Sequence, residues 1–241
     1  MSGAPRTYLA GHEAIERAFA QGEPVRVLLV GVEDHSAATG QLVRLAEDHA
    51  ARVWRGGPGD LRRMSRSREP QSVMALLGAK PEAELDDLLT RGGISWLLHR
   101  ASYPSNAGFV VRTAEVSGAD GVVIDAQWNH QDRSRVRHVS MGASLLLPVI
   151  FDSWQHVVER AHAHDVRVVA IEDVGDNAPW QVDLREKCVC VIGGERDGID
   201  PVLLTACDAV VRVPMAGFVP SYNLQAAMAA VAVERLRQLT G

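Results

Sequence analysis

The residues best suited to chemistry lie in three stretches of the second half of the chain. These are NAGFVVRTA at 106–114, IGGERDGID at 192–200 and VVRVPMAGFVPSYNLQAAMAAVAVERL at 210–236. The last combines a short apolar strand, a loop that ends with Ser221 and Asn223, and an Ala-rich helix. A loop that ends at a helix N-terminus presents free backbone N–H groups. We therefore expect a ligand site built from loops in this half of the chain.

The glycines of the second stretch invite a nucleotide-binding interpretation. A dinucleotide fingerprint needs G-x-G-x-x-G directly after the first strand of a domain, with an acidic residue about 20 positions later. Gly193, Gly194 and Gly198 come late, enclose Glu195 and lack that spacing. No P-loop, His-Glu-x-x-His or Gly-x-Ser-x-Gly motif is present either. The sequence therefore lacks the common signatures of nucleotide-binding proteins, zinc proteases and serine hydrolases.

Composition describes an ordinary globular protein. The chain has 241 residues, 46% hydrophobic and 23% charged, with a formal net charge of −5. An acidic total does not exclude RNA, because phosphate binding needs only a local basic face. No apolar run reaches the ~18 residues of a membrane helix, and the N-terminus lacks signal-peptide order. We expect a cytoplasmic protein with no membrane contact.

The cysteines give no sign of a metal or a disulfide framework. Cys188 and Cys190 alternate with valines, so in a strand both face one side, and Cys207 stands apart. Cys-x-Cys is neither the redox spacing nor a zinc pair. We predict reduced core thiols and no metal site.

The first part of the chain, residues 1–79, alternates helical and strand patterns, which predicts a small α/β sandwich. Its end is rich in arginine, whose guanidinium group suits bidentate phosphate contacts. A solvated helix face is the equal alternative. The candidates for RNA contacts here are Arg62, Arg63 and Arg66.

Residues 80–93 have an acidic, helical pattern that ends in a glycine pair, which indicates a linker. Residues 94–241 then alternate apolar strands with helices, which predicts an α/β domain with a mostly parallel sheet covered on both faces. The expected strands are 94–99, 121–125, 166–171 and 187–192, and the expected helices are 109–116, 152–164 and the segment after Asn223.

Together the three stretches resemble the motifs of the SpoU/TrmH-type methyltransferases of the SPOUT superfamily. The matching patterns are Asn-x-Gly-x-x-x-Arg-x-Ala, Gly-Gly-Glu-x-x-Gly-Ile and Pro-Met-x-Gly-x-x-x-Ser-x-Asn, in that order. More weakly, the GHEAIERAF segment near the N-terminus resembles the L30e-like substrate-binding domain of rRNA-modifying members.

The resemblance implies a deep trefoil knot that holds S-adenosyl-L-methionine. Periodicity alone does not predict a knot, since true knots are very rare. The implied cofactor-binding residues are Gly193, Gly194, Val213, Met215, Gly217, Tyr222 and Leu224. The implied catalytic residues are Asn106, Arg112, Glu195, Ser221 and Asn223.

The implied reaction is methyl transfer to a ribose 2′-hydroxyl of RNA, most simply 23S rRNA. In this family the arginine of the first motif is proposed to orient or deprotonate that hydroxyl. A guanidinium has a pKa above ~12 and is a poor base. We therefore interpret Arg112 as an electrostatic clamp on a phosphate and on the developing alkoxide.

The third motif departs from the family pattern. The family most often has Ser-Leu-Asn-Val-Ser, whereas this chain has Ser221-Tyr222-Asn223-Leu224-Gln225. Tyr222 would lie where the adenine packs, and an aromatic ring can stack there. The usual aspartate before the first motif is also absent.

Partners follow from the same resemblance. Arg133 and Arg135 lie near the first motif and are candidates for RNA phosphates, with surface solvation as the equal alternative. The Ala-rich helix fits the homodimer of the family. A tRNA substrate, a non-catalytic RNA-binding protein on the same fold and an unrelated nucleotide-binding regulator remain alternatives at this point.

Overall fold

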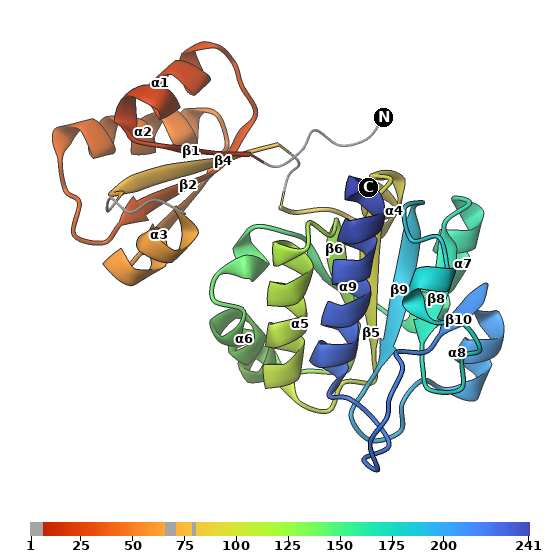
Figure 1. The fold of residues 1–241 in the computed structure, drawn as a ribbon. Coiled ribbons are helices and arrows are strands. Elements are labelled where there is room, and N and C mark those ends of the chain that lie inside the picture. Colours follow the sequence, from red (N-terminus) through yellow and green to blue (C-terminus); the bar gives the residue numbers. More distant parts are fainter. Residues whose placement is uncertain (1–6, 66–70, 79–80) are drawn as a thin grey trace. The chain divides into compact units, whose positions relative to one another are not determined.

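The computed structural model describes residues 7–65, 71–78 and 81–241. The chain divides into two compact units, Gly3–Pro81 and Glu82–Gly241. Each unit has its own layers of helices on a sheet (Figure 1).

The first unit contains a four-stranded sheet in the order β1-β4-β2-β3. β4 is antiparallel to β1 and β2, whereas β2 and β3 are parallel. The helices α1 and α2 pack on one face through Ile15 and Leu42, and α3 packs on the other through Leu61. The elements are β1 Thr7–Ala10, α1 His12–Ala20, β2 Val25–Gly31, α2 Ala37–Asp48, β3 Arg52–Gly56, α3 Pro58–Met64 and β4 Val73–Leu77.

This arrangement confirms the predicted α/β alternation. Alternate residues of β2 face opposite layers, since Leu28 packs with α1 and α2 while Leu29 packs with α3. The L30e-like character of the unit stays a prediction.

The second unit contains a six-stranded sheet in the order β10-β8-β9-β5-β6-β7, in which every pairing is parallel. The predicted parallel α/β domain is therefore confirmed. Its strands are β5 Ile94–His99, β6 Gly121–Asp125, β7 Val149–Phe151, β8 Arg167–Ile171, β9 Cys188–Gly193 and β10 Ala209–Val211.

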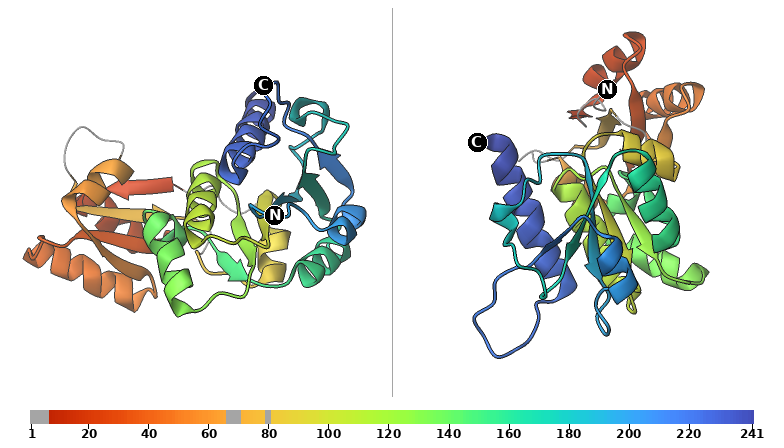
Figure 2. Two further views of the ribbon diagram at one scale, coloured as in Figure 1. Left: turned by 90° about the horizontal axis from the view of Figure 1, so that it is seen from below. Right: turned by 90° about the vertical axis from the view of Figure 1, so that its right-hand side faces the viewer.

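Helices cover both faces of this sheet (Figures 1 and 2). One face carries α5, α6 and α9 on a core that includes Trp96 and Leu98, and the other carries α4, α7 and α8 on a core that includes Leu97. The helices are α4 Leu85–Thr90, α5 Pro104–Val116, α6 His130–Val139, α7 Trp154–Ala163, α8 Pro201–Ala206 and α9 Leu224–Thr240, with short 3-10 turns η1 Ala143–Leu145 and η2 Pro179–Gln181.

The segment 80–93 differs from the linker that the sequence suggested. It contains α4, whose Leu85, Leu88 and Leu89 are buried against α7 in the second unit. The glycine pair that suggested a linker instead separates α4 from β5. Because these leucines cover one face of the sheet, α4 belongs to the second unit.

The order of the strands changes direction between β5 and β9, which is a topological switch point. From β5 the strands proceed outward to β6 and β7, whereas β8, β9 and β10 lie on the other side. In open parallel sheets, ligands bind at the carboxyl ends of the strands beside such a point. The loop between β10 and α9 extends beyond this edge (Figures 1 and 2).

Candidate active site

The first two motifs meet through the side chains of Asn106 and Glu195. β5 and β9 are neighbours, with His99 paired to Gly193, so both following segments leave the sheet at one edge. Nδ2 of Asn106 donates a hydrogen bond to Oε1 of Glu195 at 2.6 Å. The backbone N–H of Ser102 donates to Oε2 at 2.9 Å. Both carboxylate oxygens are therefore held by groups of the β5–α5 segment.

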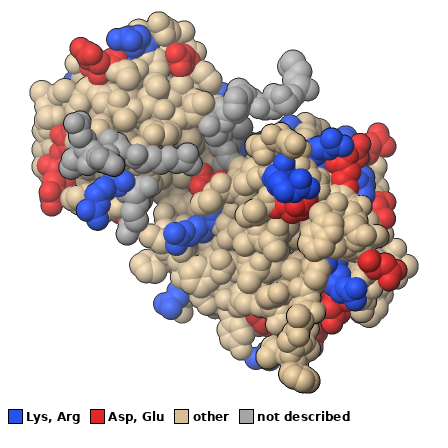
Figure 3. Space-filling view, viewed as in Figure 1, with Lys and Arg blue, Asp and Glu red and all other residues tan. Residues whose placement is uncertain are grey.

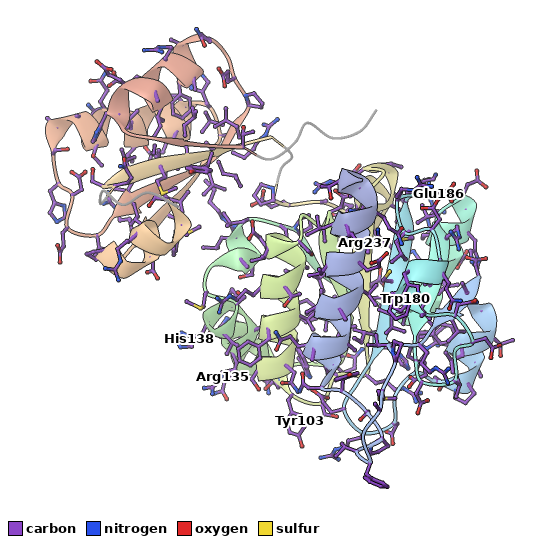
Figure 4. All side chains as sticks on the ribbon, in the orientation of Figure 1. Tyr103, Arg135, His138, Trp180, Glu186 and Arg237 are labelled. Carbon is purple, nitrogen blue, oxygen red and sulfur yellow. The ribbon has the colours of Figure 1, made fainter. Side chains whose placement is uncertain are left out.

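Asn106 lies inside a helix rather than in the expected turn before one. α5 begins at Pro104, with Tyr103 as its N-cap residue. Proline is favourable at a first helical position because its ring fixes φ and the N–H it lacks would have no helical partner. The first turn of α5 thus directs Asn106 toward Glu195. Tyr103 lies at this end of α5 (Figure 4).

Gly108 of the first motif permits close packing of α5 on α6. A Cβ at this position would lie 2.6 Å from Cβ of Val139. Real Cβ contacts are longer, so a side chain here would push the two helices apart. The glycine of the motif therefore has a structural role.

Gly193 and Gly194 are required by the packing of their own loop. A Cβ on Gly193 would lie 2.4 Å from the carbonyl carbon of Gly198, and one on Gly194 would lie 2.2 Å from the carbonyl oxygen of Arg100. Arg100 itself has φ of 51°. The close approach at these two glycines is thus made by protein backbone.

A cavity of about 500 Å³ lies beside this loop. Buried Ile171, Ile192 and Leu224 contribute apolar surface to it. Its size and mixed lining are those of a small-molecule site. The remaining lining residues are Glu172, Asp173, Gly193, Gly194, Glu195, Arg196, Asp197, Gly198, Val213, Met215, Pro220, Ser221, Tyr222, Asn223 and Ala227.

Most residues assigned to the cofactor from the motifs line this cavity. They are Gly193, Gly194, Val213, Met215, Tyr222 and Leu224. Gly217 is not among the lining residues, and a Cβ there would have no heavy atom within 4 Å. Of the residues assigned to catalysis, Glu195, Ser221 and Asn223 line the cavity, and Asn106 reaches it through Glu195.

The third motif forms the outer wall of the cavity. The Tyr222 hydroxyl donates to the carbonyl oxygen of Pro214 at 3.2 Å, which closes the loop on itself. Oδ1 of Asn223 accepts from the N–H of Gln225 at 3.0 Å, so Asn223 is the N-cap of α9. The residues that depart from the family pattern thus form hydrogen bonds within the loop and at the start of α9.

Glu172 is a lining residue that the sequence reasoning missed. Its Oε2 accepts from the N–H of Ile199 at 2.9 Å, which ties the end of β8 to the loop after β9. Gly198 has φ of +63°, and a Cβ there would lie 2.9 Å from the same oxygen. The sequence feature that could have identified Glu172 is an acidic pair, Glu172 and Asp173, directly after the expected strand 166–171.

Arg112 does not line the cavity of its own chain. It is exposed on α5, and its Nη1 donates to Sδ of Met141 at 2.9 Å. It lies about 9 Å along the helix and about 120° around it from Asn106. The two residues assigned to one motif therefore face different directions.

The candidate RNA-binding arginines lie on two different units. Arg62 is exposed on α3, whereas the side chain of Arg63 and all of Arg66 lie outside the described residues. Arg135 is exposed on α6 and, like His138, projects outward (Figure 4). Basic and acidic side chains are interspersed on the face shown in Figure 3. The guanidinium of Arg133, which is also exposed on α6, lies over the ring of Phe151.

The thiols lie away from the cavity lining. Cys188 and Cys190 are buried on the same side of β9, with their Sγ atoms 4.0 Å apart. Burial and the neighbouring Asp208 raise the pKa of Cys207 to about 11. All three are free, as predicted.

Among the described residues, no cluster of His, Cys, Asp and Glu could hold a metal ion, and no helix has the length and apolar character to cross a membrane.

The parallel sheet, the Asn106–Glu195 contact and the cavity all lie in the second unit. The model of the SpoU rRNA methylase family matches residues 94–233. The chain belongs to this family.

Curated relatives include two 23S rRNA (guanosine-2′-O-)-methyltransferases named RlmB. The protein from Xylella fastidiosa is 31% identical over 163 residues, which cover 66% of each chain, just under two thirds of that relative. The protein from Bordetella pertussis is 26% identical over 239 residues and matches 97% of this chain and 98% of its own.

A similar solved structure is the SpoU methyltransferase AviRb from Streptomyces viridochromogenes in complex with AdoMet. It is 26% identical, with a TM-score of 0.61, and the match covers 98% of this chain and 91% of AviRb. The AdoMet-bound rRNA methyltransferase from Sinorhizobium meliloti is 21% identical with a TM-score of 0.63 and supports the fold.

Proposed function

We propose that this protein transfers a methyl group from S-adenosyl-L-methionine to a ribose 2′-hydroxyl of RNA, with 23S rRNA as the substrate. The observation that carries the proposal is the contact of Asn106 with Glu195 beside a cavity of about 500 Å³. That contact joins two motifs, and the third motif walls the same cavity. The curated relatives with 23S rRNA in their names support the choice of substrate.

The cavity residues fit the cofactor in size and charge. Apolar Ile171, Ile192 and Leu224 suit an adenine ring, whereas Glu172 and Asp173 are carboxylates. S-adenosylmethionine carries a sulfonium and an ammonium group, which carboxylates attract. When bound, it supplies an electrophilic methyl group. The residues that would hold it are those of the cavity wall, including Val213, Met215 and Tyr222.

The protein itself contributes positioning and charge. Glu195 is fixed by Ser102 and Asn106 and can orient a ribose hydroxyl at the cavity mouth. The guanidinium of Arg112 binds the flanking phosphate in this proposal and stabilises the developing alkoxide. Ser221 and Asn223 lie on the opposite wall and complete the substrate contacts.

We further propose that the active form is a homodimer. Neighbouring α5 and α9 expose apolar residues, namely Phe109 and Val116 on α5 and Val233 and Leu236 on α9. Ala226 and Ala230 are also exposed on α9 and would allow close helix packing. Pairing two copies through this face would let Arg112 of one chain serve the cavity of the other.

We assign the first unit, with Arg62, Arg63 and Arg66, to RNA binding as an L30e-like domain. We assign the segment from β9 to α9 to a trefoil knot around the cavity. A ribosomal RNA substrate would place the enzyme in the cytoplasm.

The proposal is tested by binding and transfer measured separately. Calorimetric binding of S-adenosylmethionine by the full chain tests the cavity, and labelled methyl transfer to 23S rRNA and tRNA transcripts tests the reaction. Transfer to tRNA alone would overturn the rRNA assignment. RNA binding without cofactor binding would replace the enzyme with a non-catalytic RNA-binding protein.

A further inference from the structure

A cluster of two aromatic rings and an arginine lies at the ends of β6 and β7. Trp128 follows β6, and Phe151 ends β7. Their ring centroids are 6.4 Å apart with an interplanar angle of 64°. The guanidinium carbon of Arg133 lies over the Phe151 ring, 4.1 Å from its centroid. Both rings are half-buried and pack against the hydrophobic core between α5 and the sheet, whereas Arg133 is exposed.

The guanidinium of Arg133 is held in a fixed plane. Its Nε donates to the carbonyl oxygen of Trp128 at 3.3 Å, and its flat side rests on Phe151. The helix that carries it begins with a capping box, in which Asn129 and Asp132 cap each other's backbone N–H groups. A surface arginine normally samples many rotamers, and these contacts restrict that freedom. Phe151 covers one face of the guanidinium, and Arg133 as a whole is exposed.

We propose that Arg133, stacked on Phe151, is a platform for one unpaired base of the RNA substrate, next to the nucleotide that is methylated. This proposal rests on the RNA-modifying function given above. Proteins read unstacked RNA bases by stacking them on aromatic rings and arginine planes. A guanidinium already stacked on Phe151 and bonded to Trp128 provides such a plane with little ordering cost.

The surroundings of the platform suit RNA. Arg137 is four residues from Arg133, so it lies on the same side of α6, and both are exposed. Arg137 can therefore hold the phosphate of the stacked nucleotide, whereas Arg135 points to another side of the helix.

The platform also lies close to the candidate active site. β6 is the neighbour of β5, and the backbone N–H of Arg100, just after β5, donates to the carbonyl oxygen of Asp125 at the end of β6. α6 packs on α5, which carries Asn106. Consecutive nucleotides of one strand can thus occupy the platform and the cavity mouth.

The test separates stacking from charge through Arg133→Lys, which keeps the charge and loses the plane. RNA affinity and transfer are measured on full-length 23S rRNA transcript, with Arg133→Ala, Phe151→Leu and the double variant Arg133→Lys/Phe151→Leu beside it. Arg185→Lys is the matched control, because this exposed arginine precedes β9 and so lies at the opposite edge of the sheet. Melting temperatures check the folding of each variant.

We expect Arg133→Lys and Arg133→Ala to weaken RNA binding to a similar extent, about tenfold, as the loss of one stacked base predicts. Phe151→Leu should give a similar loss, and the double variant should lose no more than the larger single effect. Arg185→Lys should bind like the wild type, and cofactor affinity should be unchanged throughout.

Wild-type affinity in Arg133→Lys together with a loss in Arg133→Ala would overturn the platform and leave a phosphate contact. A wild type that binds RNA without methylating it would refute the proposed function, and the binding series would still decide the platform. A wild type that binds no RNA would overturn both.

Discussion

Nδ2 of Asn106 lies 2.6 Å from Oε1 of Glu195, although 89 positions separate the two residues in the sequence. The contact exists because β5 and β9 are parallel neighbours whose ends lie side by side. It fixes a carboxylate at the edge of the cavity.

Glu195→Gln should lower kcat/KM for methyl transfer by about tenfold to a hundredfold, since a hydrogen bond to a charged group contributes ~1.5–3 kcal/mol. The amide keeps one acceptor oxygen and places an NH2 group opposite the other donor, so one of the bonds from Asn106 and Ser102 is lost. Steady-state kinetics measure the loss, and Glu159→Gln on the exposed side of α7 is the control. Equal activity in both variants would remove Glu195 from the positioning of the substrate.

Gly194→Ala should impair both folding and cofactor binding. The new Cβ would lie 2.2 Å from the carbonyl oxygen of Arg100, which forces the loop that lines the cavity to move. Overpacking costs ~1–3 kcal/mol, which corresponds to a melting temperature lower by about 2–12 °C in a chain of this size.

Gly217→Ala is the matched control because a Cβ there would have no heavy atom within 4 Å. Calorimetry should show wild-type cofactor affinity for this variant and a clear loss for Gly194→Ala. A larger loss for Gly217→Ala than for Gly194→Ala would contradict the cavity described above and restore the cofactor role that the motif suggests for Gly217.

Mixed dimers test whether Arg112 serves the partner chain. Arg112→Ala and Glu195→Gln should each be poorly active alone. After unfolding and refolding together, half of the dimers carry one site with both native residues, so about a quarter of wild-type activity should return. No recovery, in a mixture shown to contain heterodimers, would place Arg112 at the cavity of its own chain.

Stability should decline at alkaline pH through Cys207. Its pKa is raised to about 11 in the folded protein, against an ordinary value of 9.0. The folded state therefore binds more protons than the unfolded state between these values, and the free energy of unfolding falls as pH rises through them. Urea unfolding at pH 8 and pH 10 should show a smaller decline for Cys207→Ala than for the wild type. Equal declines would exclude this thiol as the cause.

The sequence predicted the second unit well because its strands are short apolar runs. The segments 94–99 and 121–125 coincide with β5 and β6. A strand buried on both faces must be apolar throughout, and the glycines and polar residues around it mark its ends. The burial of Cys188 and Cys190 follows from the same pattern.

Other features depend on packing that the local sequence does not reveal. The helical pattern of 80–93 is present as α4, but the sequence does not show that Leu85, Leu88 and Leu89 are buried in the second unit. The role of Glu172 arises from its bond to Ile199, 27 residues away. The orientation of Arg112 depends on the start of α5 at Pro104, which sets the rotation of the whole helix.

The most direct test of the proposed function is transfer of labelled methyl groups from S-adenosylmethionine to unmodified 23S rRNA by the wild type and by Arg112→Ala. We expect label at one alkali-resistant linkage for the wild type, as 2′-O-methylation requires. For Arg112→Ala we expect a loss of at least about a hundredfold in a variant that still binds the cofactor. Label that is absent, or that lies on a base and leaves every linkage alkali-sensitive, would contradict the proposed function.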